Sequence, residues 1–286
     1  MFDAHVDLVL DRIKPGDQVL DVGGWARCFN RATHVIDFNP YATRGRHYIE
    51  HLNLGPQGGE VEHFSAETWV EWELCNHKPW PFADKQFDFC TCSHTLEDIR
   101  DPLWVCAEMN RVAKAGYIEV PSRLFESSRG REPGVPVGLS HHRWFVEVEG
   151  SHITFNHKTP HVHGDPRCSV PMTVWRQLPE REFITWMFWE DGFTFNEGWL
   201  GIPHLVEFAA KYVPEHAWDA PDPAADAEIA RLGVELAMSQ NHVRALNLQI
   251  EELRGRLEAT EGLGPRSIAL AKRVHEFAKV IRRKAS

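Results

Sequence analysis

Residues 19–24 read VLDVGG, and this run decides how the chain is expected to fold. Its apolar residues, together with Gln18, predict a short buried strand, and the acid and paired glycines that close it indicate a tight turn at the carboxyl end. Similar apolar runs follow at residues 33–37, 69–74, 87–92 and 116–120, with helical patterns between them. Short buried strands that alternate with crossover segments predict a parallel α/β sheet within residues 1–125.

One crossover helix is marked at both of its ends. Asp101 is a favoured N-cap residue, and Pro102 follows it at the first helical position. Lys114 and Gly116 provide the basic residue and the glycine that are typical of a helix end. We therefore expect this helix to end at residues 114–116 and to lie on the sheet.

Residues 126–215 are rich in aromatic residues and turn signals, and they predict a β-rich extension of the core. Residues 144–149 and 152–155 flank a Gly-Ser turn and predict a β-hairpin. Residues 183–189 and 193–195 flank an Asp-Gly turn and predict a second hairpin. These antiparallel strands are expected either to extend the edge of the first sheet or to cap its mouth.

The last segments differ in kind from the body. After a linker rich in proline and alanine at residues 220–226, residues 227–260 carry a heptad pattern whose a and d positions are Ile229, Leu232, Leu236, Val243, Leu246, Ile250, Leu253 and Leu257. This pattern predicts a coiled coil through which the chain forms a homo-oligomer. The alternative is an amphipathic helix that lies on the body.

Charge is spread unevenly along the chain. Residues 266–286 hold seven Lys or Arg and one Glu, whereas the whole chain has a net charge of −10. This segment predicts a basic amphipathic helix that either contacts an anionic membrane surface or packs with its charges in water. The acidic body argues against nucleic acid as a partner, since phosphate contacts need a basic face.

Composition also indicates the compartment. The six cysteines include no CxxC pair, no apolar run approaches the roughly 18 residues of a membrane span, and the first residues do not resemble a signal peptide. We expect a cytoplasmic protein, with peripheral contact at the inner face of the membrane as an option through the basic helix.

Ligands of open parallel sheets bind beyond the carboxyl ends of the strands, so residues at those ends are the candidate site. The NAD fingerprint is absent, because Trp25 and Cys28 stand where it needs glycine, and no Walker motif is present. Asp37 closes the second strand, where a carboxylate can accept hydrogen bonds from both hydroxyls of a ribose. It can instead serve as an N-cap for the residues that follow.

Five segments, taken in order, resemble S-adenosylmethionine-dependent methyltransferases of the type-11 group. They are VLDVGG at residues 19–24, VID at 35–37, KPWPFADKQFDF at 78–89, SHTLEDI at 93–99 and EMNRVAKAG at 108–116. The resemblance covers roughly residues 17–122 and implies a Rossmann-like methyltransferase sheet. The region around residues 141–145 looks like the extension of methyltransferase-like proteins in bacterial surface-glycan pathways.

The resemblance implies a role for particular residues. Asp21, Gly23 and Gly24 line the methionine part of S-adenosylmethionine, Asp37 holds its ribose, and Glu73 lies near the adenine. Cys92, Ser93 and His94 face the methyl group, and Trp25 offers an aromatic face to the sulfonium cation. The implied reaction is methyl transfer to an oxygen of a glycan or another sugar-containing small molecule, with His94, His141 or His142 as the base.

Two departures favour an alternative function. Only the first glycine of the family's motif is in register, and residues 25–32 are too few for a normal helix before the second strand. The alternative is a catalytically degenerate scaffold that organises a polysaccharide-assembly complex through its coiled coil.

Histidine is abundant, with 17 residues in the chain. His141, His142, His161 and His163, with Asp165, offer ligand types for a metal-dependent hydrolase. No tight metal motif such as HExxH is present, so the sequence predicts no metal and favours exposed histidines on hairpin strands.

Overall fold

The computed structural model describes residues 1–45, 57–132 and 134–213. These residues belong to one compact unit, Met1–Asp219. The predicted linker, the coiled coil of residues 227–260 and the basic helix of residues 266–286 lie outside the described residues. Among the described residues, no helix has the length and apolar character needed to cross a membrane.

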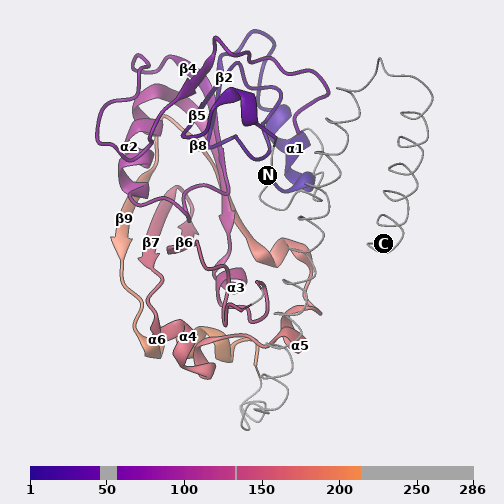
Figure 1. Ribbon diagram of the computed structural model, residues 1–286, viewed down its shortest axis with the longest axis vertical. Helices are drawn as coiled ribbons and strands as arrows, with labels where there is room; N and C mark the ends of the chain where they lie inside the picture. Colours follow the sequence, from indigo (N-terminus) through magenta and orange to yellow (C-terminus); the bar gives the residue numbers. More distant parts are fainter. Residues whose placement is uncertain (46–56, 133, 214–286) are drawn as a thin grey trace, which may run out of the picture. The chain divides into compact units, whose positions relative to one another are not determined.

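The unit is built on a six-stranded sheet in the order β3-β2-β1-β4-β5-β8 (Figure 1). Its strands are β1 (Val19–Val22), β2 (His34–Asp37), β3 (Trp69–Glu71), β4 (Phe87–Ser93), β5 (Ala113–Pro121) and β8 (Ile184–Glu190). The first five are parallel, and β8 runs antiparallel to β5. This arrangement is a Rossmann-like α/β fold, as the sequence predicts, with strand order reversing between β1 and β4.

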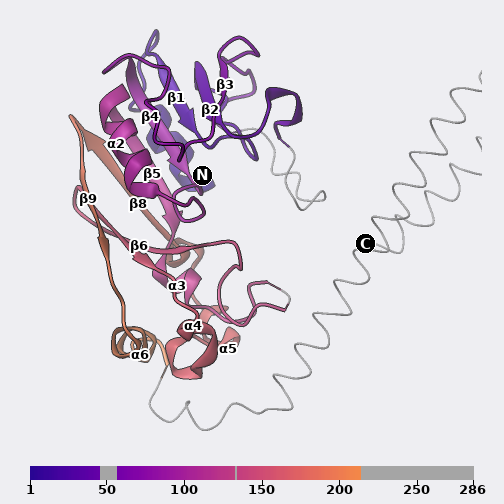
Figure 2. The ribbon, with the colours of Figure 1, turned by 60° about the vertical axis from the view of Figure 1, so that its left-hand side comes forward.

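Helices cover both faces of this sheet (Figures 1 and 2). The face that includes Leu20 and Cys90 packs on α2 (Pro102–Val112), and the face that includes Val19 and Phe89 packs on α1 (Asp3–Leu10). Successive residues of a strand point to opposite faces, so each strand contributes to both apolar cores. Asp21 has the parity of Val19 and therefore points to the α1 side of the sheet.

Helix α2 begins where the sequence predicts and ends earlier. Asp101 accepts a hydrogen bond from the Trp104 backbone N–H at 3.0 Å, and Pro102 is the first helical residue. The expected end at residues 114–116 is wrong, because β5 already starts at Ala113. Gly116 lies inside β5, where a Cβ would stand 2.4 Å from the Cys90 carbonyl oxygen and 2.7 Å from the Trp189 ring. The glycine thus serves close packing within the sheet and does not end the helix.

The second predicted hairpin is also wrong. Strand β8 joins the edge of the main sheet, whereas β9 (Thr194–Gly198) pairs in parallel with β7 (His152–His157) in a three-stranded sheet. Asp191 and Gly192 do form a turn, with φ of 59° and 128°, but the chain leaves it toward the other sheet. The Asn110 side chain holds this exit by hydrogen bonds with the backbone of Phe193, 2.8 Å to its carbonyl and 3.1 Å from its N–H.

The first hairpin is confirmed. Strands β6 (Trp144–Glu149) and β7 are antiparallel and lie in the small sheet β6-β7-β9. Short helices gather below that sheet, at the end of the unit away from β2 and β3 (Figure 2). The remaining elements are η1 (Tyr41–Thr43), α3 (Arg123–Glu126), α4 (His161–Gly164), η2 (Pro166–Cys168), α5 (Met172–Trp175), η3 (Glu180–Phe183) and α6 (Ile202–Ala210).

The Asp101 cap gives a test of this assignment of α2. Asp101→Ala should lower the free energy of unfolding by about 1 kcal/mol, because the Trp104 N–H loses its acceptor. Asp101→Ser keeps a capping oxygen but removes the carboxylate that pairs with His77 at 2.8 Å, so it separates the two contributions. Urea denaturation should place the serine variant close to wild type; equal losses in both variants would contradict the capping role.

Candidate active site

A loop without helix follows β1, and two buried acids hold it. Asp21 is 4% exposed and accepts hydrogen bonds from the Phe29 backbone N–H and the Thr91 hydroxyl, both at 2.9 Å. Burial raises the pKa of Asp21 to about 6, although both hydrogen bonds favour the charged form. The carboxylate of Asp21 is therefore engaged within the protein, where it positions the loop.

The paired glycines fit this loop closely. Gly23 has φ of +73°, and a Cβ there would lie 2.2 Å from the Thr95 hydroxyl oxygen. A Cβ on Gly24 would lie 2.1 Å from a carboxylate oxygen of Asp21. Both positions thus need glycine for steric reasons, independently of any ligand.

Asp37 closes β2 beside this loop. Asp37 is 5% exposed. Its carboxylate accepts hydrogen bonds from the backbone N–H groups of Trp25 at 3.1 Å and Asn39 at 2.7 Å. Burial raises the pKa of Asp37, against these hydrogen bonds. Asp21 and Asp37 lie on the paired strands β1 and β2 and accept hydrogen bonds from the same loop, so the structure brings them together at the carboxyl edge.

Trp25 and Glu73 belong to two segments that are hydrogen-bonded to Asp37. The half-buried Trp25 packs on the α1-side core and donates from Nε1 to the Thr43 hydroxyl at 3.0 Å. Glu73 is two residues beyond β3, and its side chain is 47% exposed and 3.8 Å from Arg100. The backbone N–H of Trp72 donates to the Asp37 carbonyl, which ties the Glu73 segment to the end of β2.

The three predicted residues at the end of β4 occupy different environments. Cys92 is fully buried in the α2-side core, and burial raises the pKa of its thiol well above the usual value. Ser93 is partly exposed and donates to Glu119 at 3.2 Å. His94 is 43% exposed and has φ of 52°, a strained conformation of a kind that is frequent at functional sites. The structure thus places Ser93 and His94 at the rim and Cys92 below it.

His94 lies between two buried carboxylates. Its Nε2 is 3.1 Å from Glu119, and its Nδ1 is 3.7 Å from Glu97. Partial loss of contact with water and the amino group of Met1 would lower the pKa of His94, but the two carboxylates outweigh them and raise it to about 9. The same pairing holds the pKa of Glu119 down at about 2 despite its burial. His94 is therefore an imidazolium at neutral pH.

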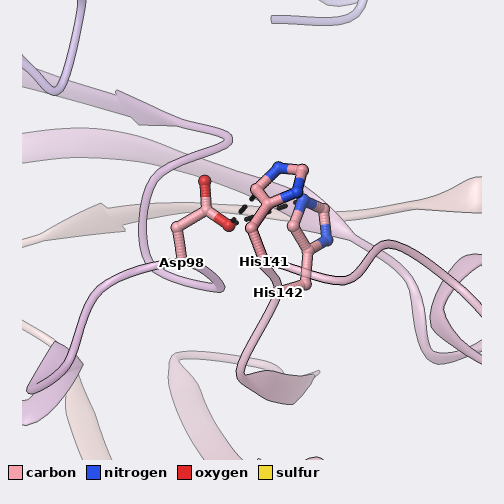
Figure 3. Close-up of side chains that lie close together, drawn as sticks. All are labelled: Asp98, His141 and His142. Atoms are coloured by element: carbon pink, nitrogen blue, oxygen red, sulfur yellow. Dashed lines mark ion pairs between the residues drawn. The ribbon is translucent and has the colours of Figure 1, made fainter. Parts of the chain in front are cut away.

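A second cluster lies beside the first and includes the other two predicted histidines (Figure 3). Asp98 follows β4, and its Oδ1 is 3.9 Å from Nε2 of His141 and 3.5 Å from Nε2 of His142. Burial would lower the pKa of His142, but its hydrogen bond to Glu126 raises it. Burial and the charge on His142 lower the pKa of His141, while burial and the charge on Glu97 raise the pKa of Asp98 to about 7.

The other histidines considered for a metal site lie elsewhere. His161 and His163 are in the short helix α4 and not on a hairpin strand, which corrects the expectation. Asp165 forms a two-pronged pair with Arg167, at 3.0 and 2.7 Å, instead of joining them.

Four acids of this region were missed by the sequence analysis: Glu97, Asp98, Glu119 and Glu126. Glu119 had a signal, since an acid within the apolar run of β5 is unusual unless it is paired. No sequence signal marks Glu126, because its partners His142 and Lys158 are distant in sequence. Chemically, the edge combines a carboxylate suited to hydroxyl groups at Asp37 with two partly exposed imidazoles.

Comparison with known proteins agrees with this arrangement. Residues 37–118 match the family model described as a methyltransferase domain. This match supports a methyltransferase domain with S-adenosylmethionine as its cofactor. No curated protein matches the chain.

Solved structures resemble the chain at low identity. An S-adenosylmethionine-dependent methyltransferase from Aquifex aeolicus has 20% identity over 45% of this chain and 68% of its own, with a TM-score of 0.29. Another from Mesorhizobium loti has 13% identity over 54% and 64%, also with a TM-score of 0.29. The chain spans about half of the matched structures from Haloferax volcanii and Bacillus subtilis, 52% and 51%. The fold assignment therefore rests on the strand order, and the cofactor on the family match.

The His94 pair predicts a pH dependence of stability. The pKa of His94 is raised to about 9 from an ordinary 6.5, so the pair stabilises the fold fully below pH 6.5 and its contribution is lost as pH rises through 9. Urea titrations at several pH values should show a stability gap between wild type and His94→Gln that closes across this window. A gap that stays constant with pH would contradict the charged pair.

Proposed function

We propose that this chain transfers a methyl group from S-adenosylmethionine to an oxygen of a glycan or another sugar-containing small molecule. The observation that carries the proposal is the position of Asp37. It closes the second of two adjacent central strands, and its carboxylate is fixed by the backbone of the same loop that Asp21 holds. This is the edge at which ligands of such sheets bind.

The residues present fit the cofactor at its ribose. Asp37 Oδ2 accepts from the Trp25 N–H, and a carboxylate oxygen can accept two hydrogen bonds, so it can also take a ribose hydroxyl. Asp37 would hold that sugar, while Asp21 and the two glycines keep the loop close to it. When bound, the cofactor supplies an electrophilic methyl group on a sulfonium.

The oxygen acceptor is supported by the polar groups beyond β4. His94 and His141 are partly exposed, and imidazoles and carboxylates both form hydrogen bonds with sugar hydroxyls. His94 Nδ1 lies 3.7 Å from Glu97, too far for a hydrogen bond, whereas Nε2 is engaged by Glu119. Nδ1 is thus the atom of His94 that can take the proton of an acceptor hydroxyl once the ring is neutral.

A second function has its own observation in favour. Residues 25–33 form no helix, so no helix N-terminus faces the edge between β1 and β2 to bind the cofactor's carboxylate. This favours the degenerate scaffold, which organises a polysaccharide-assembly complex without binding the cofactor. The two functions differ in whether the edge binds an adenosyl ligand.

Calorimetry with S-adenosylhomocysteine distinguishes them. We expect wild type to bind and Asp37→Ala to bind about 10–100-fold more weakly, the loss from one or two hydrogen bonds to a charged group. Asp84→Ala is the matched control, since Asp84 is 79% exposed and precedes β4, at the opposite edge of the sheet. No heat from wild type at high micromolar ligand would favour the scaffold, and equal affinity in Asp37→Ala would remove Asp37 from the site.

A further inference from the structure

Asp98, His141 and His142 form a cluster of metal-ligand type that does not include the proposed adenosyl residues Asp21 and Asp37 (Figure 3). One ligand atom from each lies within 4.8 Å of the others. Zinc bonds to nitrogen and oxygen of about 2.0–2.2 Å place the donors of a tetrahedral site roughly 3.4 Å apart. The distances from Asp98 Oδ1, 3.5 Å to His142 and 3.9 Å to His141, are close to this spacing.

One carboxylate oxygen of this cluster, and both of the neighbouring Glu97, lack hydrogen-bond partners. Asp98 Oδ1 is buried and accepts no hydrogen bond, and neither does either oxygen of Glu97, a residue that is 1% exposed. Buried carboxylate oxygens without donors are costly, and such groups are normally paired or bind metal. Asp98 Oδ1 is therefore an acceptor without a hydrogen-bond donor beside two imidazoles, which a bound cation would balance.

His142 is oriented as a metal ligand would be. Its Nδ1 lies 2.5 Å from Glu126, which leaves Nε2 toward Asp98. Glu126 is fully buried and is itself held by Lys158 at 2.8 Å. A carboxylate on the far nitrogen of a histidine is the usual second contact of metal-binding histidines, where it fixes the ring and its tautomer.

The loops that carry the cluster are fastened to each other by groups that are not ligands. The Arg143 N–H donates to the Glu97 carbonyl at 2.7 Å, and Trp144 Nε1 donates to the Ile99 carbonyl at 2.9 Å. These bonds fix the residues on both sides of Asp98 against those that follow His142. The three side chains are thus brought together by the fold before any ion binds.

From this geometry we propose that Asp98, His141 and His142 bind one divalent transition-metal ion, with zinc as the ion that suits them best. Two nitrogen donors and one carboxylate disfavour magnesium and calcium, which take oxygen ligands. His141 is 60% and Asp98 36% exposed, so the fourth position is open to solvent. Water or a hydroxyl oxygen of a small molecule would complete the site, as in zinc sites that keep one exchangeable position.

Zinc binding to the metal-stripped full chain, without cofactor, tests the proposal independently of methyl transfer. Calorimetry with Zn²⁺ alone should give a saturable site that Mg²⁺ does not occupy. His141→Ala is the deciding variant because its exposed side chain can be removed without opening the core. Loss of a residue that only supports a metal ligand typically weakens metal binding by about 10–100-fold. His141→Ala removes a ligand itself, so it should weaken zinc binding by more than this, and Asp98→Asn should weaken zinc binding as well.

A matched control separates this site from general binding to histidines. His77 is 61% exposed and lies 2.8 Å from Asp101, so it is a comparable imidazole–carboxylate pair with no second histidine. His77→Ala should bind zinc as wild type does, and Co²⁺ should give a tetrahedral absorption band in both that His141→Ala lacks. Absence of zinc binding in wild type, or equal binding in His141→Ala and wild type, would overturn the proposal.

Discussion

The constraint on which this structure depends is that a buried carboxylate has to be met by donors. Along the carboxyl edge of the main sheet this requirement decides the course of the loops. Asp21 and Asp37 accept hydrogen bonds from the backbone N–H groups of Phe29 and Trp25, which fixes the short connection without a helix between β1 and β2. Glu119 does the same for the turn after β4, since it pairs with His94 and accepts from Ser93. The rim is therefore shaped by acids as much as by apolar packing.

The same constraint separates structural acids from candidate functional ones. The carboxylates of Asp21 and Glu126 have their partners within the protein, and both are inaccessible to solvent. Glu97 and Asp98 are adjacent in sequence and lie close to the rim. Both retain buried carboxylate oxygens without hydrogen bonds. Evolved folds leave few such groups, and where they do, a ligand, ion or reaction commonly accounts for them.

The sheet could be predicted from the sequence because its strands are short apolar runs that end on recognisable signals. The sequence predictions are wrong where one residue type has two common structural roles. Gly116 is typical of a helix end, yet here it allows the Trp189 ring to approach β5. Asp191 and Gly192 are typical of a hairpin turn, yet the contacts of Asn110 direct the chain to another sheet. Such outcomes depend on partners about 70 to 80 positions away, which no local pattern contains.

As with the sheet, part of the candidate site can be predicted from the sequence and part cannot. Asp21 and Asp37 follow from strand ends alone, whereas the pairing of Asp98 with His141 and His142 needs the contact between two loops. That contact also explains how the proposed base His94 and the proposed metal site can lie at one edge of the sheet. The connection that follows β4 begins at His94, which is turned to Glu119, and continues through Asp98, which is turned to the histidines. Because Glu97 lies between them and neighbours both, a charge gained at either cluster alters the electrostatic environment of the other. A cation bound at Asp98 would therefore disfavour the imidazolium at His94, which couples the metal site to the proposed base.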